Sequence, residues 1–390
     1  MSPRHISFPA HGRSVITCLK LSNNRIISAS DDHSIHVYSP DTGELIHSLK
    51  GHEGGVWAVD ATKDILVSGS TDRTVRIWDL ETGQCKHIFG GHTSTVRNLV
   101  IVKPETIEVE RGGEMVKERL PTRPLIVSGS RDHTLRVWDL PRAEDVEYKC
   151  SSDSEDNEDN IAEEAENNPY HKFHLQGHEG AVRALACQGH TAVSGSYDHT
   201  VRVWDLVTGK CKWVLTGHEQ KVYSVTLDVH RNFAASGSMD HTVRVWDITT
   251  GQCQHVLRNH TSLVGLIGLS PSFLVSAAAD STLSVWDPQT GEHLQTLAGH
   301  DGAITCFYHD ELKVLSGSNG NLKLWDIRDG RMVRNVLTGI IGVWQVAVQG
   351  RRCVAALNRS DSTSIEVIEF GEEDEEWKSV PVALEAEEED

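Results

Sequence analysis

The segments SYDHTVRVWD (196–205) and SMDHTVRVWD (238–247) share nearly the same ten residues, and this motif decides the fold. Further copies are STDRTVRIWD (70–79), SRDHTLRVWD (130–139) and ADSTLSVWD (279–287), with weaker ones at 30–39 and 318–326. The closing tryptophans at 204, 246, 286 and 325 are 42, 40 and 39 residues apart. A period of about forty residues, with short β-prone runs broken by Gly, Asp and Asn turns, predicts a four-stranded antiparallel unit in each repeat.

A Gly-His pair or a variant of it precedes each strong copy. These pairs are Gly51-His52, Gly91-His92, Gly177-His178, Gly217-His218, Asn259-His260 and Gly299-His300. The two elements together are typical of WD repeats, which predicts an all-β protein built as a WD-repeat β-propeller. Counting a first unit that ends at Tyr38, six Trp-Asp units and a degenerate last unit at 343–370, we expect eight blades over residues 4–370, with seven as the alternative.

Several segments stand outside the repeat. Two intervals between repeats are too long, so insertions are expected at 103–124 and 141–172. The second is expected to be a disordered acidic loop, with kinase sites at Ser151, Ser152 and Ser154 or with no role beyond solvation. Residues 371–390 are expected to form an acidic tail. The strand that closes the ring is expected from residues 4–8, with residues 377–382 as the alternative.

The net charge of −19 is concentrated in the acidic segments. Residues 143–168 carry −10 and residues 371–390 carry −9, which leaves a neutral propeller. Binding to nucleic acid through general phosphate attraction is therefore not expected. The sequence contains no apolar run long enough for a membrane span, no cysteine spacing for zinc and no catalytic motif. We expect a non-enzymatic protein of the nucleus and cytoplasm, with no cofactor, metal or membrane partner.

Most of the His, Asp and Trp residues belong to the repeat itself. Resemblance to WD-repeat families implies that the Gly-His histidine, the turn Asp, a strand Ser or Thr and the Trp form a hydrogen-bonded relay in each blade. This structural role falls to Asp72, Asp132, Asp198, Asp240 and Asp280. The arginines before the tryptophans, at 76, 136, 202 and 244, are expected on a strand face.

The positions that vary between blades carry the information about binding. In a four-strand meander, the connection that enters a blade and the turn between its second and third strands lie on the same face. After the apolar residue that opens each inner strand, the blades carry Ile16, Trp57, Arg97, Arg183, Tyr223, Gly265, Thr305 and Trp344. Before the turn Asp they carry Asp31, Thr71, Arg131, Tyr197, Met239, Ala279 and Asn319, and the eighth blade is too degenerate to align.

The two series separate basic residues from apolar ones. Cations and hydroxyls gather in blades two to four, and apolar side chains gather in blades five to eight and in blade one. Arginines bind phosphate through planar, multidentate hydrogen bonds, and several converging arginines repel each other unless an anion lies among them. The pattern therefore predicts a site for a phosphorylated peptide. A small-molecule phosphate and a rim without a binding role are the alternatives.

Over roughly residues 4–370, the chain resembles the WD-repeat domain of the cell-division-control F-box proteins, substrate receptors of SCF ubiquitin ligases. The resemblance rests on stretches such as GHEGGVWAV, GHTSTVRNL, GHEGAVRAL and HTSLVGLIGLS. It implies that the phosphate of a phosphothreonine-proline degron is bound by Arg97, Arg131, Arg183 and Tyr197, with Arg73 nearby. It also implies a proline pocket of Trp57, Thr71 and Thr95, and a hydrophobic pocket of Val15, Tyr223, Met239, Leu263 and Trp344.

Family members carry an F-box and a dimerisation segment upstream of the first blade, and here only a few residues precede it. Docking to the SCF adaptor is therefore left open, with a fragment, a truncated product or a receptor that works by another route as the possibilities. A monomer is expected. The expected partners are phosphorylated substrates destined for proteasomal degradation, with a role in the cell cycle. A general WD-repeat scaffold for protein complexes is the alternative function.

Overall fold

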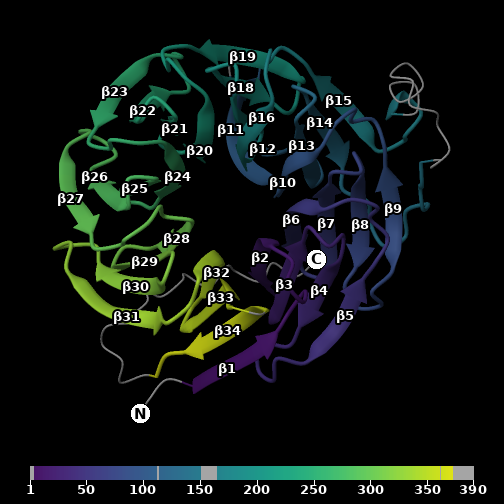
Figure 1. Ribbon diagram of the computed structural model, residues 1–390. Helices are drawn as coiled ribbons and strands as arrows, with labels where there is room; N and C mark the ends of the chain where they lie inside the picture. The colour runs from purple at the N-terminus through teal and green to yellow at the C-terminus, as the bar shows by residue number, and fades with distance from the viewer. Residues whose placement is uncertain (1–3, 112–113, 151–164, 361, 372–390) are drawn as a thin grey trace.

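Eight antiparallel sheets of four strands each stand around a central axis in the computed structural model of the chain (Figure 1). The structure describes residues 4–111, 114–150, 165–360 and 362–371, without the side chains of 107–115. The prediction of an all-β, eight-bladed propeller is confirmed, and the seven-bladed alternative is wrong. Side chains packed between neighbouring sheets form the core, and the tryptophans at 78, 138, 204, 246 and 325 are among its largest fully buried members.

The two inner strands of each blade follow the repeat pattern. The innermost strands are β2 (Ile16–Ser22), β6 (Val56–Thr62), β10 (Val96–Val102), β16 (Val182–Gln188), β20 (Val222–Asp228), β24 (Val264–Leu269), β28 (Cys306–His309) and β32 (Gly342–Gln349). The second strands are β3 (Arg25–Ser30), β7 (Ile65–Ser70), β13 (Leu125–Ser130), β17 (Thr191–Ser196), β21 (Phe233–Ser238), β25 (Leu274–Ala278), β29 (Lys313–Ser318) and β33 (Arg352–Asn358). The second strands are almost wholly buried, because each lies between two blades.

The two outer strands complete each sheet. The third strands are β4 (Ile35–Tyr38), β8 (Val75–Asp79), β14 (Leu135–Asp139), β18 (Val201–Asp205), β22 (Thr242–Asp247), β26 (Thr282–Trp286), β30 (Asn321–Asp326) and β34 (Thr363–Glu369). The outermost strands are β5 (Leu45–Leu49), β9 (Cys85–Phe89), β15 (His171–Leu175), β19 (Lys210–Leu215), β23 (Cys253–Arg258), β27 (His293–Ala298), β31 (Met332–Thr338) and β1 (Arg4–Pro9).

The N-terminal strand closes the ring. β1 pairs antiparallel with β34, from Arg4 opposite Glu369 to Pro9 opposite Ser364. The expected closure by residues 4–8 is therefore confirmed, and residues 377–382 lie outside the described part of the chain. The buried carboxylate of Glu366 strengthens the joint, because His5 Nε2 lies 2.7 Å from it and the Ser7 hydroxyl donates to it at 2.9 Å. Closure joins the first and last described strands in one sheet and lets blade eight pack against blade one, so that both faces of every blade are covered.

The expected relay is present in blades two to six. In blade four, His178 Nδ1 lies 2.8 Å from Asp198, His178 Nε2 lies 2.7 Å from the Ser194 hydroxyl, and Trp204 Nε1 donates to the same hydroxyl at 2.8 Å. Each buried polar group of this relay therefore has a partner. Blade one has a version that the sequence analysis missed, in which His11, placed before its glycine, contacts Asp32 and Ser28 at 3.0 and 2.8 Å.

The arginines before the tryptophans lie on strand faces, as expected. Their guanidinium groups lie against the glycines of the Gly-His pairs, where a side chain would meet them. A Cβ atom on Gly177 would lie 2.3 Å from Arg202 Nη1, and one on Gly217 would lie 2.6 Å from Arg244 Nη1. Both glycines also have a positive φ, of 144° and 148°. Residues with a side chain rarely adopt this backbone conformation, and the missing Cβ lets the guanidinium lie against the backbone.

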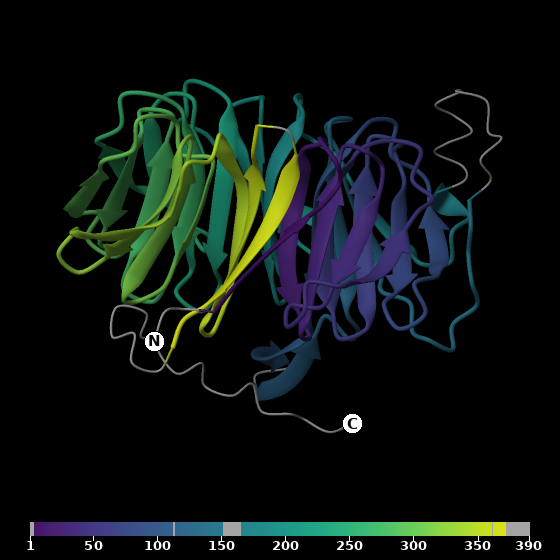
Figure 2. The same cartoon turned by 60° about the horizontal axis from the view of Figure 1, so that its bottom comes forward.

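The insertion at 103–124 contains a hairpin of two strands, β11 (Glu105–Arg111) and β12 (Glu114–Leu120). It interrupts the connection between β10 and β13. That connection lies on the face opposite to the one that carries the variable positions, because β10 runs from one face to the other. Figure 2 shows the hairpin projecting from its face of the ring. The insertion therefore leaves the candidate binding face uncovered.

The expectation of a disordered loop at 141–172 is wrong for its described residues. Lys149 forms a parallel bridge with Ile88 on β9, and Tyr170 stacks on Phe89 with ring centroids 5.5 Å apart. The Tyr170 hydroxyl donates to the Val146 carbonyl at 2.6 Å. Aromatic burial on the outer edge of blade two thus fixes both ends of the insertion. The candidate kinase sites Ser151, Ser152 and Ser154 lie outside the described residues.

Replacing Ser194 with alanine is expected to destabilise the protein by about 2–4 kcal/mol, because it leaves a buried tryptophan donor and a buried histidine acceptor without partners. Urea unfolding followed by circular dichroism measures the change. Thr208→Ala is the control, since its hydroxyl bonds Asp205 in an exposed turn, and it should cost less than about 0.5 kcal/mol. Equal losses in the two variants would contradict a structural role for the relay.

Acid is expected to destabilise the fold in two stages. Burial lowers the pKa of His300 to about 4, so below pH ~6.5 the unfolded chain binds a proton that the folded chain does not. Stability therefore falls from pH ~6.5 towards 4. Burial opposes ionisation of Asp198, but hydrogen bonds from His178 and Thr200 outweigh it and hold the pKa of that carboxyl well below its usual range, so a second loss follows below pH ~4. Urea midpoints between pH 7.5 and 3 measure both stages. A midpoint that rises on acidification to pH 4.5 would contradict the expectation.

Candidate functional site

The two series of variable residues lie on one rim of the propeller. Backbone N–H groups of the turn donate to carbonyls of the entering connection in six blades: Asp31 to Val15, Thr71 to Gly55, Arg131 to Thr95, Tyr197 to Ala181, Met239 to Lys221 and Ala279 to Leu263, at 2.9 to 3.3 Å. The prediction that these two places share a face is therefore confirmed.

A β-bulge at the start of the inner strands presents the first series. The register shifts between Val56 and Ala58 in blade two, and the same shift recurs in blades one, three to six and eight. The residue within each bulge is unpaired in the ladder, which re-aims its side chain. These residues are Thr17, Trp57, Arg97, Arg183, Tyr223, Gly265 and Trp344.

The structure corrects one member of this series. In blade one the bulge residue is Thr17, and Ile16 instead takes the buried position of Val56, with 1% of its surface exposed. The sequence alignment was one residue out because Val15 and Ile16 are both apolar. The Thr17 hydroxyl is directed at the Val56 and Ala29 carbonyls, so it joins blades one and two.

The ring of Trp57 holds Arg97 in place. The Arg97 guanidinium carbon lies 4.0 Å from the ring centroid, in a cation–π contact between blades two and three. Burial lowers the pKa of Arg97, and the positive charge of Arg183 on the next blade lowers it further. A bound anion would offset both the lost hydration and the repulsion between the two guanidinium groups.

Two tyrosines continue the row into blades four and five. The Tyr197 and Tyr223 rings have centroids 5.3 Å apart, and the Arg183 guanidinium carbon lies 5.7 Å from the Tyr223 centroid. Burial raises the pKa of Tyr223, and a hydrogen bond with Tyr197 raises it further. Tyr223, which the sequence placed in the apolar half, therefore stands at the boundary between the two arcs.

Lys221 is a rim cation that the sequence analysis missed. Its ammonium nitrogen lies 4.7 Å from the centroid of the Tyr197 ring. The signal was available, because Lys221 directly precedes the apolar residue that opens β20, as Thr95 does for β10. It adds a fourth positive charge to the row formed by Arg97, Arg131 and Arg183.

Arg131, Thr71 and Thr95 occupy their expected places on the rim. Arg131 and Thr71 are exposed in the turns of blades three and two, and Thr95 lies half-buried in the connection that enters blade three. Within the described ranges, Arg97, Arg131 and Arg183 form no ion pair with a carboxylate. Their charges are therefore available to a ligand.

Arg73 belongs to a different group from the other arginines. Its φ of 73° matches the values of 73°, 70° and 68° at His133, His199 and His241, which follow the turn Asp in other blades. It is thus the blade-two version of a left-handed turn residue and follows Thr71 and Asp72 along the turn.

The apolar residues are spread over the remaining blades. Met239 is 41% exposed in the turn of blade five, while Val15, Leu263 and Trp344 are half-buried on blades one, six and eight. Trp344 packs against the core cluster shared by blades eight and one. Its indole Nε1 is buried without a hydrogen-bond partner in the described part of the chain. The rim thus has an apolar side on these blades.

Two further features of the described residues bear on function. No helix among them is long and apolar enough to cross a bilayer. No group of three or more His, Cys, Asp or Glu side chains within the same ranges could hold a metal ion.

The fold and the rim define a repeat propeller with a mixed cationic and apolar binding face. The family model "WD domain, G-beta repeat" matches residues 2–39, 43–79, 120–139, 169–205, 209–247, 251–287 and 291–326, and the chain belongs to this WD-repeat family. A crystal structure of the computationally designed protein Ika8 is similar in fold, with a TM-score of 0.72 and 28% identity over 93% of this chain and 98% of that one.

Two relatives show which WD-repeat proteins the chain is similar to. The chain is 46% identical to "Cell division control protein 4" of Candida albicans over 95% of its own length and 54% of the relative's. It is 50% identical to "F-box/WD repeat-containing protein 7" of Drosophila melanogaster over 48 residues, 12% of this chain and 4% of that one. The chain thus spans about half the length of the first relative, and the similarity covers nearly all of its own propeller.

Sulfate is expected to stabilise the protein through the arginine row. With a dissociation constant of about 10 mM, 50 mM sulfate adds about 1 kcal/mol by mass action. Thermal unfolding in sulfate and in sodium chloride of equal ionic strength measures the difference. The double variant Arg97→Met/Arg183→Met should lose the sulfate-specific part, and Arg258→Met, on the exposed outer strand β23, should keep it. Loss of the effect in the control, or its survival in the double variant, would contradict an anion site here.

Proposed function

We propose that the chain binds phosphothreonine-proline peptides on this rim and forms the substrate-recognition part of an SCF-type ubiquitin ligase. The observation that carries the proposal is the row of Arg97, Arg131 and Arg183, which has no carboxylate partner among the described residues. A phosphate dianion accepts charge-assisted hydrogen bonds from several guanidiniums at once. The mutual repulsion of the three guanidinium groups destabilises the unliganded protein, and a bound anion removes this repulsion.

The other half of the rim favours a peptide over a free phosphate. Met239, Leu263 and Trp344 present apolar surface across the rim from the arginines, and a small anion would leave this surface unused. In a peptide, hydrophobic residues before the phosphothreonine would contact this side. The proline that follows the phosphothreonine would rest against Trp57, whose ring is already held by Arg97. The cationic half of the rim would thus provide affinity for the phosphate, and the apolar half would provide preference for particular neighbouring residues.

The similarity to Cell division control protein 4 supports the same class of function. It extends along nearly the whole of this chain, and the F-box/WD relative matches a part of it. In this proposal the chain directs phosphorylated proteins to proteasomal degradation in the cell cycle. It works as a monomer in the nucleus and cytoplasm, without enzymatic activity of its own. Docking to the SCF adaptor falls to an F-box that the propeller itself does not supply.

Isothermal titration calorimetry with a phosphothreonine-proline peptide and its unphosphorylated twin tests the proposal. Only the phosphorylated peptide should bind. Arg131→Ala and Arg183→Ala should each weaken binding roughly ten- to hundredfold, because each removes a charge-assisted hydrogen bond of about 1.5–3 kcal/mol. Arg258→Ala serves as a charge-matched control and should bind like the wild type.

Two results would overturn the proposal. One is equal binding of the two peptides, and the other is full affinity in both rim variants. A partner protein that is still retained in pull-downs after all three arginines are replaced would instead support the scaffold function.

A further inference from the structure

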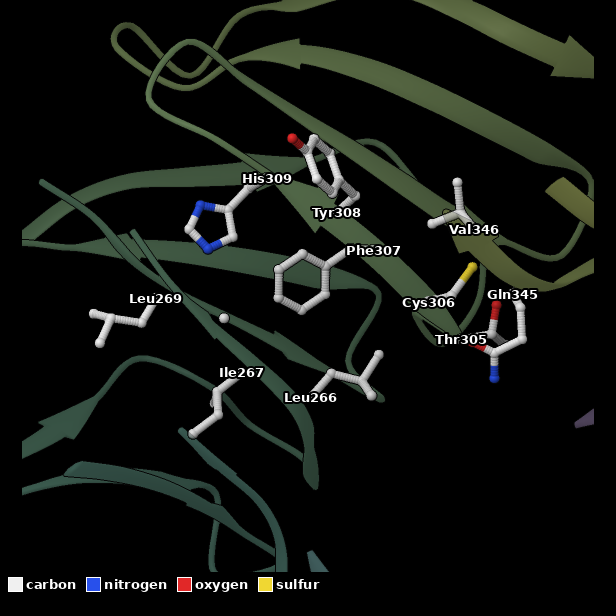
Figure 3. A pocket seen from close by; sticks show the side chains of 11 residues that line it. Leu266, Ile267, Leu269, Thr305, Cys306, Phe307, Tyr308, His309, Gln345 and Val346 are labelled. Carbon is white, nitrogen blue, oxygen red and sulfur yellow. The ribbon is translucent and has the colours of Figure 1, made fainter. Parts of the chain in front are cut away.

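A slot with a mixed apolar and neutral polar lining opens in the inner wall of the propeller along blades six to eight (Figure 3). Its volume is about 360 Å³, and its lining comes from the innermost strands β24, β28 and β32. The larger apolar side chains of its wall are Leu266, Ile267, Leu269, Phe307 and Val346. Pockets of this size hold small organic ligands in other proteins.

Gly268 of β24 lines this slot, and Gly265 directly precedes the lining residue Leu266. A Cβ atom on Gly265 would meet nothing within 4 Å, so the rim above the slot is open. A Cβ atom on Gly268 would lie 2.8 Å from the His309 ring and 3.2 Å from Phe307, so a side chain there would displace both rings. At the bulge position of Gly265, other blades carry the large residues Trp57, Arg97, Tyr223 and Trp344.

The slot is electrically neutral. No Asp, Glu, Lys or Arg lines it. Burial raises the pKa of Cys306 and of Tyr308 to about 12, and burial lowers the pKa of His309, so all three are uncharged at neutral pH. Asp310 and Glu311 lie near the His309 end of the slot, so an anion would be repelled there and would lose its hydration without compensation.

One oriented hydrogen-bond acceptor lies at the end of the slot. The Gln345 amide nitrogen donates to the Thr17 carbonyl at 3.0 Å, which fixes the orientation of the amide. Gln345 lies beside Thr305 at one end of the slot (Figure 3), and the bond to Thr17 uses the amide nitrogen, which leaves Oε1 as the acceptor. An acceptor that the fold has already oriented selects for a donor on the ligand.

We propose that this slot binds a small, neutral aromatic compound with a single hydrogen-bond donor, of the indole or phenol kind. The ring lies against Phe307 and the aliphatic side chains of β24, and its N–H or O–H donates to Gln345 Oε1. The site is separate from the phosphate arc, which lies in blades two to four. It therefore does not depend on the peptide function proposed above.

Fluorine NMR with 5-fluoroindole tests the proposal directly. The fluorine resonance should shift and broaden when wild-type protein is added, and unlabelled indole should reverse the change. The 1-methyl derivative, which lacks the donor, should bind roughly two- to tenfold more weakly, as expected for the loss of one hydrogen bond. The anionic 2-carboxylate should bind more weakly still, because the slot carries no positive charge.

A variant that covers the slot provides the structural test. The Trp57 ring reaches Arg97 on the next blade, so a tryptophan at the equivalent position 265 should reach Thr305 and cover the opening. Gly265→Trp should therefore reduce 5-fluoroindole binding at least tenfold, while Gly265→Ala, the control, should stay within twofold of the wild type. Gln345→Met should bind 5-fluoroindole and its 1-methyl derivative equally, which gives a second test that does not rely on filling the slot.

Arg183→Ala separates this proposal from the phosphopeptide site, because it should bind 5-fluoroindole as the wild type does. The proposal is overturned if the wild type leaves the fluorine resonance unchanged. It is also overturned if Gly265→Trp binds with wild-type affinity, or if Gln345→Met still prefers the compound with the donor.

Discussion

The hydrogen bond between a buried histidine and the turn aspartate holds the binding rim together. In blade two, Asp72 lies 2.6 Å from His52 Nδ1 and also accepts from the Glu53 backbone at 3.0 Å. One carboxylate thus joins the connection that enters the blade to the turn between its second and third strands. Both segments carry variable rim residues, so the position of Trp57 relative to Thr71 depends on this bond. A rim fixed in this way keeps its cations close together before any anion arrives.

Blades seven and eight lack the complete relay, and they carry two features that the other blades do not have: the slot and the closure of the ring. Blade seven has Asn319 and Gly320 in its turn, and His300 keeps its contact with Ser316 at 2.7 Å while its Nδ1 has no partner among the described residues. Its inner strand begins only at Cys306, and the slot lies beside it. Blade eight replaces the relay with Glu366, which joins the two ends of the chain. The slot and the joint that closes the ring therefore both lie in repeats that depart from the consensus sequence.

Much of the rim could be predicted from sequence, because the repeat itself assigns positions. The turn and the entering connection were correctly placed on one face, and Arg97, Arg131 and Arg183 were correctly assigned to it. The errors arose where the pattern is ambiguous. Ile16 was chosen over Thr17 because two apolar residues, Val15 and Ile16, stand side by side in the sequence. Residues 141–150 and 165–172 were predicted to belong to an acidic loop. Their packing could not be foreseen, because their aromatic residues contact a strand that lies more than fifty positions away in the sequence.

The sequence by itself predicted eight blades, with seven as the alternative, and most of the rim residues, because period, turn chemistry and alternation act locally. Only the tertiary structure decided which rim residues meet. Trp57 and Arg97 are forty positions apart, and their contact exists because ring closure and a β-bulge at each blade entrance set neighbouring inner strands in one register. The slot follows the same rule, since Gly268 on β24 lies against the rings of His309 and Phe307, which come from β28 of the next blade. Contacts between blades depend on the geometry of the whole ring, which no single repeat encodes.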